Sequence, residues 1–159
     1  MFGTEQDWTR GFEVVLSLKA AMHQIAKPIF ESHGGKEMEE NFFVFDTPAP
    51  AVKSCIEIRD AVRAYNAAHD AVHHIILDGF GVHCSDMLIV PGTDIHWGDA
   101  VNTASKLGED LAQNEELLIS PEVMEKIRGD ELLAGYTWET KVLHASGVDL
   151  TSFVLVDKQ

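Results

Sequence analysis

The segment Asp94–Lys106 carries an amide and an ammonium group at a spacing that suits nucleotide binding. Asn102 and Lys106 are four residues apart, so on a helix their side chains project from the same face. A carboxamide and a cation directed at one point fit a ligand that contains a ribose and phosphates. The alternative is an ordinary amphipathic helix with a solvated asparagine and lysine, and the spacing alone favours that simpler interpretation.

The residues around this pair predict the helix itself. Trp97 and Gly98 close a loop, and Asp99 occupies the N-cap or the first turn, where an acid is favourable. Apolar residues then recur with the helical period and form one stripe: Ala100, Ala104, Leu107 and Leu111. We therefore expect a helix that buries this stripe and presents Asn102 and Lys106 from another face.

The composition indicates one globular domain that spans residues 1–159. With 45% hydrophobic and 24% charged residues, the chain can bury a core without disulfides or structural metals. The net charge of −14 argues against nucleic acid or an anionic membrane surface as the main partner. Cys55 and Cys84 lie in unrelated segments, so we interpret both as reduced thiols. Since the sequence shows no transmembrane run and no signal-peptide pattern, the expected location is the cytoplasm.

Hydrophobic periodicity and turn residues predict an α+β fold. Two long amphipathic helices are expected at 14–32 and 49–69, with Pro28 kinking or breaking the first. Between them, residues 36–48 predict two strands joined by a tight turn. Residues 75–83 and 87–90 are expected to form one antiparallel hairpin. A strand at 117–120 follows, and it leads into a helix with Ser120 as N-cap. Residues 135–143 and 151–157 are expected to form a last hairpin. This order indicates a mostly antiparallel sheet with helices packed on one face.

Four stretches resemble the catalytic domains of class III adenylyl and guanylyl cyclases, and they follow one another in the order and spacing of that family. They are MFGTEQDWT, HGGKEMEENFFVFD, GVHCSD and WGDAVNTASK. The last is similar to the family pattern (W/F)-G-x-x-V-N-x-A-x-R-L. The resemblance implies that Asn102 positions the ribose. Lys106 stands where the family has the arginine that stabilises the phosphates in the transition state, and lysine lacks the planar fork that grips phosphate oxygens. The resemblance covers nearly the whole chain and implies the ferredoxin-like α+β sandwich of these cyclases.

The same resemblance assigns two further nucleotide-binding residues. Lys36 matches the lysine that recognises the purine in adenylyl cyclases. Asp94 is a candidate for reading adenine, although the family carries its aspartate two residues before the aromatic of the W-G pair. Here Asp94 lies three residues before Trp97, so His96 would be a one-residue insertion.

The metal-binding side of the family's site is altered in this sequence. The resemblance places Thr4 where the family has its first metal-binding aspartate and Glu40 where it has the second. A threonine hydroxyl is a poor substitute for a carboxylate as a ligand of Mg²⁺ or Mn²⁺. A solvated acidic hairpin tip without a metal is the alternative interpretation of Glu39 and Glu40. The family's first strand is expected to be truncated or very short here.

The resemblance implies two functional hypotheses, both based on head-to-tail pairs of cyclase domains that share their sites. The first is a catalytically impaired cyclase-homology domain, a pseudoenzyme without a metal cofactor. It acts in cyclic nucleotide signalling as a dimerising or nucleotide-binding regulatory half, beside a second copy or another cyclase-type domain. The second is an active adenylate cyclase that converts ATP to cyclic AMP and pyrophosphate with Mg²⁺ or Mn²⁺ at Glu40. A third option is the same fold used for another small ligand or for protein contacts.

Overall fold

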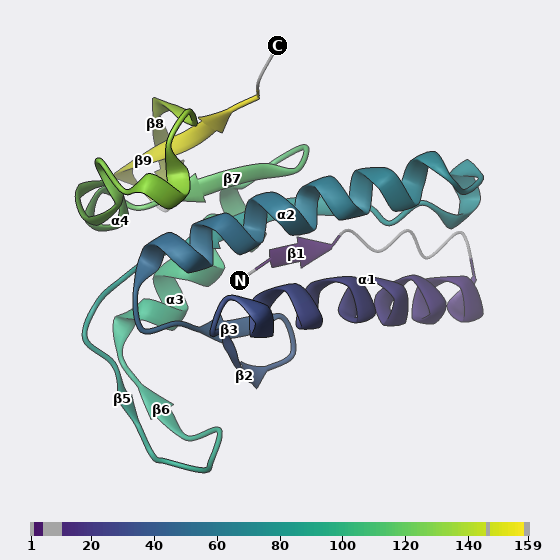
Figure 1. Ribbon diagram of the computed structural model, residues 1–159, viewed down its shortest axis with the longest axis horizontal. Coiled ribbons are helices and arrows are strands. Elements are labelled where there is room, and N and C mark those ends of the chain that lie inside the picture. Colours follow the sequence, from purple (N-terminus) through teal and green to yellow (C-terminus); the bar gives the residue numbers. More distant parts are fainter. Residues whose placement is uncertain (1, 5–10, 146, 158–159) are drawn as a thin grey trace.

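A five-stranded sheet forms the centre of the molecule in the computed structural model, which describes residues 2–4, 11–145 and 147–157 (Figure 1). Its strands, in spatial order, are β1 (Phe2–Thr4), β4 (Leu77–Val82), β7 (Glu116–Ile119), β9 (Val148–Val156) and β8 (Thr137–Ala145). β4 and β7 pair in parallel, whereas the other neighbours pair antiparallel. The predicted α+β class with a mostly antiparallel sheet is confirmed. Trp8, Thr9 and Arg10, which contribute to the first stretch of the resemblance, lie outside the described residues.

Three helices cover one face of the sheet: α1 (Phe12–Ser32), α2 (Pro48–Ala67) and α4 (Pro121–Ile127). The two long helices confirm the amphipathic pattern, and α1 continues through Pro28 instead of breaking there. Their apolar stripes meet inward-facing strand residues in one large core. Its most completely buried members include Met22, Val52, Ile58, Val62, Phe80 and Leu117. Burial of this apolar area is the main stabilising contribution to the fold.

The opposite face of the sheet carries a helical segment as well. It consists of α3 (Asp99–Ser105) and the π-helical turn η3 (Lys106–Leu111). Leu107 packs there in a second core with Leu118 of β7, while Leu117 and Ile119 of the same strand face the first core. The prediction of helices on one face alone is therefore wrong. Because successive strand residues point to opposite sides, an apolar strand such as β7 requires cover on both.

Two glycines of β4 allow this helical segment to approach the sheet closely. A Cβ on Gly81 would collide with the backbone of Ala104 and Gly108, and one on Gly79 would collide with the side chain of Ala112. The intervening Phe80 is fully buried on the other side of the strand. The sequence Gly-Phe-Gly thus alternates between a face that needs bulk and a face that tolerates no side chain.

Two small antiparallel pairs lie outside the main sheet. The β2–β3 hairpin (residues 36–44), with β2 (Lys36–Glu39) and β3 (Phe42–Val44), confirms the prediction of two strands and a tight turn. The β5–β6 ribbon (residues 88–97), with β5 (Leu88–Ile89) and β6 (His96–Trp97), corrects another prediction. The segment 87–90 pairs with β6 and not with β4, and the chain turns back through residues 90–95, between β5 and β6. The Val90 N–H donates to the Ile95 carbonyl at 2.9 Å inside this turn.

The C-terminal third follows the sequence prediction closely. Ser120 caps α4, since its Oγ accepts the Val123 N–H at 3.4 Å, and Pro121 occupies the first helical position. Short 3₁₀ turns lie at η2 (Ala71–His73) and η4 (Glu131–Leu133). β8 and β9 form the predicted last hairpin, and β9 is internal, between β7 and β8. In the described part of the chain, no helix has the length and apolar character needed to span a bilayer.

Candidate functional site

The helix predicted from the Asp94–Lys106 segment is present and begins at Asp99, with Gly98 as its N-cap residue. Asp99 is a first-turn acid, and its Oδ1 accepts the Ser85 hydroxyl at 2.6 Å. Of the predicted apolar stripe, Ala104 and Leu107 are buried, whereas Ala100 and Leu111 are half-buried. The stripe therefore faces the sheet as expected.

Asn102 and Lys106 lie on the outer side of this segment. Asn102 is exposed, Lys106 is half-buried, and the Lys106 backbone N–H donates to the Asn102 carbonyl. Lys106 forms no ion pair with the side chains at 11–144 or 147–157. It also begins the π-helical turn, a rare irregularity that is frequent at functional sites. Both groups are thus available to a ligand, and their roles in ribose and phosphate binding remain predictions.

The β2–β3 hairpin presents Lys36 and Glu40 to a common groove. Lys36 is exposed at the start of β2, and Glu40 is exposed in the turn beside Asn41, which has a φ of 66°. Both residues border the groove that the hairpin forms with α1. The structure therefore places the predicted purine-binding lysine and the predicted metal-binding glutamate at opposite ends of β2, along the same groove. It places neither residue on the helix that carries Asn102.

The other two acids of the hairpin are held by neighbouring elements. Glu37 Oε2 accepts Lys27 Nζ at 2.8 Å, and Glu37 Oε1 lies 2.8 Å from His23 Nε2. The Lys27 ammonium, followed by His23, lowers the pKa of Glu37. Glu39 Oε1 lies 2.9 Å from Nε2 of His96 on β6. These pairs fasten the hairpin to α1 on one side and to the β5–β6 ribbon on the other.

Asp94 lies in the exposed loop that joins β5 to β6, at the end of a ribbon that projects from the body of the molecule (Figure 1). Asp94 does not border the groove of Lys36 or share an element with Asn102. Within one chain, the four predicted nucleotide-binding residues thus fall on three separate surfaces: the hairpin, the ribbon and the α3 segment.

The described residues hold no complete protein site for a catalytic Mg²⁺ or Mn²⁺. At nucleotide sites Mg²⁺ takes oxygen ligands at about 2.0–2.1 Å, usually one or two carboxylates beside substrate phosphates and water. Among the side chains at 11–144 and 147–157, no group of three or more His, Cys, Asp or Glu residues could hold a metal ion. Glu39, the carboxylate that precedes Glu40, is paired with His96. Thr4 lies on β1 opposite Leu77, and Glu5 and Asp7 lie outside the described residues.

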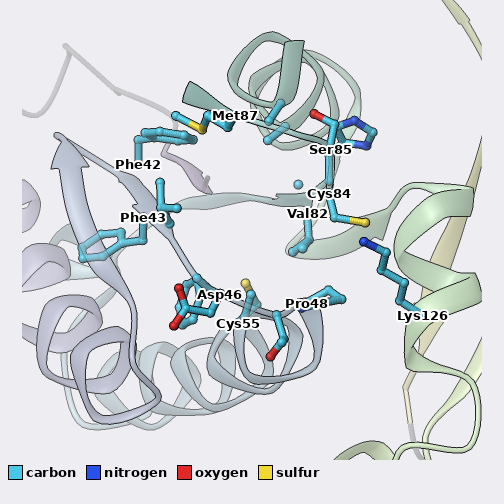
Figure 2. Close-up of a pocket in the computed structure, with 18 of the residues that line it drawn as sticks. Phe42, Phe43, Asp46, Pro48, Cys55, Val82, Cys84, Ser85, Met87 and Lys126 are labelled. Atoms are coloured by element: carbon cyan, nitrogen blue, oxygen red, sulfur yellow. The ribbon is translucent and has the colours of Figure 1, made fainter. Parts of the chain in front are cut away.

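A cavity of about 430 Å³ opens at the carboxyl end of β4, between the start of α2, the end of the β2–β3 hairpin and α3 (Figure 2). Phe42, Phe43, Val82 and Met87 supply apolar wall, and Lys126, Cys84 and Asp46 supply polar groups. None of Lys36, Asp94, Asn102 and Lys106 lines it. The sequence analysis missed this cavity, because its wall comes from distant segments with no common motif.

Comparisons with known proteins find similarity at the level of structure. No protein-family model and no curated protein matches the sequence. An adenylate/guanylate cyclase/hydrolase from Silicibacter pomeroyi matches with a TM-score of 0.78 at 15% identity, over 99% of this chain and 94% of that chain. Adenylate cyclases from Trypanosoma brucei, solved in their monomeric state, match with a TM-score of 0.72 at 14% identity, over 97% of this chain and 85% of theirs. The adenylyl cyclase CyaB from P. aeruginosa matches with a TM-score of 0.68 at 18% identity, over 93% and 85%.

The chain therefore has the fold of the adenylate and guanylate cyclase catalytic domains. This confirms the fold that the resemblance of the four sequence stretches implied. At these identities the structural similarity establishes the fold, and activity, ligand and partner rest on the residues themselves.

Proposed function

We propose that this chain is a cyclase-homology domain with impaired turnover, which acts as a dimerising and nucleotide-binding regulatory half in cytoplasmic cyclic nucleotide signalling. The observation that carries the proposal is a difference between two parts of the predicted site. The cations and the amide at Lys36, Lys106 and Asn102 are accessible. The acids are not grouped into a metal site: among the side chains at 11–144 and 147–157 no three potential ligands lie together, and Glu39, next to Glu40, is paired with His96.

The accessible groups suit nucleotide binding without chemistry. Lys36 can donate to a purine acceptor, Asn102 can hydrogen-bond ribose hydroxyls, and Lys106 can neutralise phosphate charge. In a cyclisation, a base or metal would also have to activate the ribose 3′-hydroxyl, and the described side chains hold no group of three or more potential ligands for such a metal. With a lysine in place of arginine, bidentate stabilisation of the developing phosphate charge is lost as well.

The separation of these groups supports a dimer. The predicted residues lie on three elements, the hairpin, the ribbon and the α3 segment, and another copy, or another cyclase-type domain, would complete the site around a nucleotide. The β5–β6 ribbon offers an apolar contact surface for that partner. Trp97 is 76% exposed and Leu88 is 70% exposed, with Ile89, Val90 and Ile95 beside them. Contiguous exposed apolar residues of this kind mark interaction sites.

Measurement of cyclic AMP and cyclic GMP formation from ATP and GTP, with Mn²⁺ and at high protein concentration, tests the loss of turnover. We expect no product above the protein-free control. Cyclic AMP formation that disappears in a Glu40→Ala variant would overturn the proposal and establish an active metal-dependent adenylate cyclase.

Calorimetric titration with ATP in the presence of a chelator tests nucleotide binding separately. We expect Lys36→Ala to weaken ATP binding about tenfold, because a charge-assisted hydrogen bond is lost. Lys19→Ala is the matched control, since Lys19 borders the same groove from α1 and is assigned no contact with the nucleotide. Equal affinity of the Lys36→Ala variant and the unaltered protein would remove the assignment of Lys36. Absence of any nucleotide binding would favour the third option, a fold used for another ligand or for protein contacts.

A further inference from the structure

The cavity at the carboxyl end of β4 has the size and character of a small-molecule site. Its volume of about 430 Å³ falls within the range of ligand pockets, roughly 300–1,000 Å³. One side is apolar, formed by Phe42, Phe43 and Met87 (Figure 2). The Phe43 ring is fixed by stacking on Phe30, with ring centroids 4.3 Å apart. The wall is therefore pre-formed rather than made by a mobile loop.

The polar side of the cavity ends in a cation, the Lys126 ammonium. Lys126 extends from α4 toward the Cys84 thiol, and it forms no ion pair with the side chains at 11–144 or 147–157 (Figure 2). Its ammonium acts on the Cys84 thiol, where it partly opposes the raising of the thiol pKa by burial. Other polar groups of the wall are engaged: His83 Nδ1 lies 2.9 Å from Ser120 Oγ, and Ser85 donates to Asp99.

The charges around the cavity favour an anion at the Lys126 end. The Asp46 carboxylate lies on the opposite side from Lys126, as Figure 2 shows. The wall also includes Thr47 and Pro48 at the beginning of α2, a 20-residue helix whose N-cap residue makes no side-chain cap hydrogen bond. The partial positive charge of that helix end adds to the charge of Lys126. Asp86 also lines the wall, and the Glu122 carboxylate acts on the Cys84 thiol against Lys126, so the cation and the helix end attract an anion to one end of a wall that also carries acids.

We propose that this cavity binds a small organic acid that has an apolar body. The acid group contacts the Lys126 ammonium, and the apolar body packs against Phe42, Phe43 and Met87. Ala100 and Ala104 of α3 belong to the same wall, so a bound molecule touches the inner side of the helix whose outer side carries Asn102. The site uses none of the predicted nucleotide-binding residues, and it stands or falls independently of the proposed function.

The two cysteines provide a direct measurement of occupancy. Cys84 is half-exposed on the cavity wall, whereas Cys55 is 1% exposed and burial raises its thiol pKa to about 12. Alkylation by the neutral reagent N-ethylmaleimide should therefore modify Cys84, and Cys84→Ser should abolish the reaction. The probes are 4-phenylbutyrate and its neutral amide, which have the same apolar body. The concentration of each probe that slows alkylation gives its affinity.

We expect 4-phenylbutyrate to protect Cys84 at about tenfold lower concentration than the amide, because the acid alone forms a charge-assisted contact. Lys126→Ala should abolish this difference, and Lys126→Arg should preserve it. For each variant, the rate of Cys84 alkylation with probe is compared with the rate without probe, since Lys126 also affects the reactivity of the thiol. Lys19→Ala, with a lysine on α1 removed, should behave as the unaltered protein. Equal protection by acid and amide, or no protection by either up to their solubility limits, would overturn the proposal.

Discussion

The β2–β3 hairpin and the β5–β6 ribbon are both short antiparallel pairs outside the main sheet, and they are held in opposite ways. The hairpin turns its aromatic side inward, where Phe42 and Phe43 are buried, and Glu37 ties it to Lys27 and His23 of α1. The ribbon leaves most of its apolar side chains exposed. From this difference we expect the hairpin mainly to stabilise the fold of one chain, and the ribbon to contact a second chain, as the proposed dimer requires.

Phe43→Ala should give the largest effect on the stability of the single chain. The ring stacks on Phe30 in the main core, so its removal should leave a cavity and cost about 3–4 kcal/mol of unfolding free energy. Urea unfolding followed by circular dichroism measures this loss at a protein concentration where the chain is monomeric. Trp97→Ala on the ribbon, measured in parallel, should change the free energy of unfolding by about 0.5 kcal/mol or less. Similar losses in the two variants would contradict the comparison.

Trp97→Ala should instead act on association. We expect it to weaken the dimer at least about tenfold, because large exposed aromatic residues supply much of the binding energy at protein interfaces. Sedimentation equilibrium over a range of concentrations measures the dissociation constant. Leu16→Ala is the matched control, since Leu16 is 64% exposed on α1, away from the ribbon. If Leu16→Ala and Trp97→Ala weaken the dimer equally, the ribbon is not the specific contact surface.

Glu37→Gln should have the smallest effect, and that effect should depend on pH. The Lys27 ammonium, followed by His23, holds the pKa of Glu37 below its ordinary value in the folded state, so the Glu37 charge stabilises the fold above the pKa of the unfolded chain. This contribution is lost as the pH falls through the folded-state pKa. The variant should therefore be less stable by about 1 kcal/mol or less at neutral pH, and the difference should vanish in acid. A difference that stays constant down to the lowest pH would show that Glu37 acts through packing and not through its charge.

The sequence predicted the positions of helices and strands better than it predicted which strands pair. Helical periodicity placed α1 and α2 within two residues of their observed ends, and the Ser120-Pro121 signal placed the start of α4. These signals are local, because caps and stripes depend on neighbours within one or two turns. The partner of β5 depends instead on where the chain turns back, and the segment 84–86 resembles a turn as much as Pro91-Gly92 does. The error in strand pairing arose there.

In the candidate site, too, local features could be predicted from the sequence and long-range contacts could not. Asn102 and Lys106 could be placed on one helix from their spacing alone, and the structure has them there. The pairing of Glu39 with His96 joins residues 57 positions apart, and the cavity joins the hairpin, β4, α3 and α4. Neither hydrophobic periodicity nor a sequence motif indicates such long-range contacts. The pairing of Glu39 with His96, and the lack of an ion pair between Lys126 and the side chains at 11–144 or 147–157, are therefore seen only in the three-dimensional arrangement.

The alternation of glycine and bulk in β4 has a consequence for variation of this domain. Since Gly81 sets how deeply the backbone of Ala104 and Gly108 can rest on the sheet, a single added methyl group would raise the whole α3 segment. Asn102 and Lys106 would then move together, without any change in their own chemistry. Under the proposed function, a substitution at residue 81 should change nucleotide binding by moving Asn102 and Lys106, without altering either side chain.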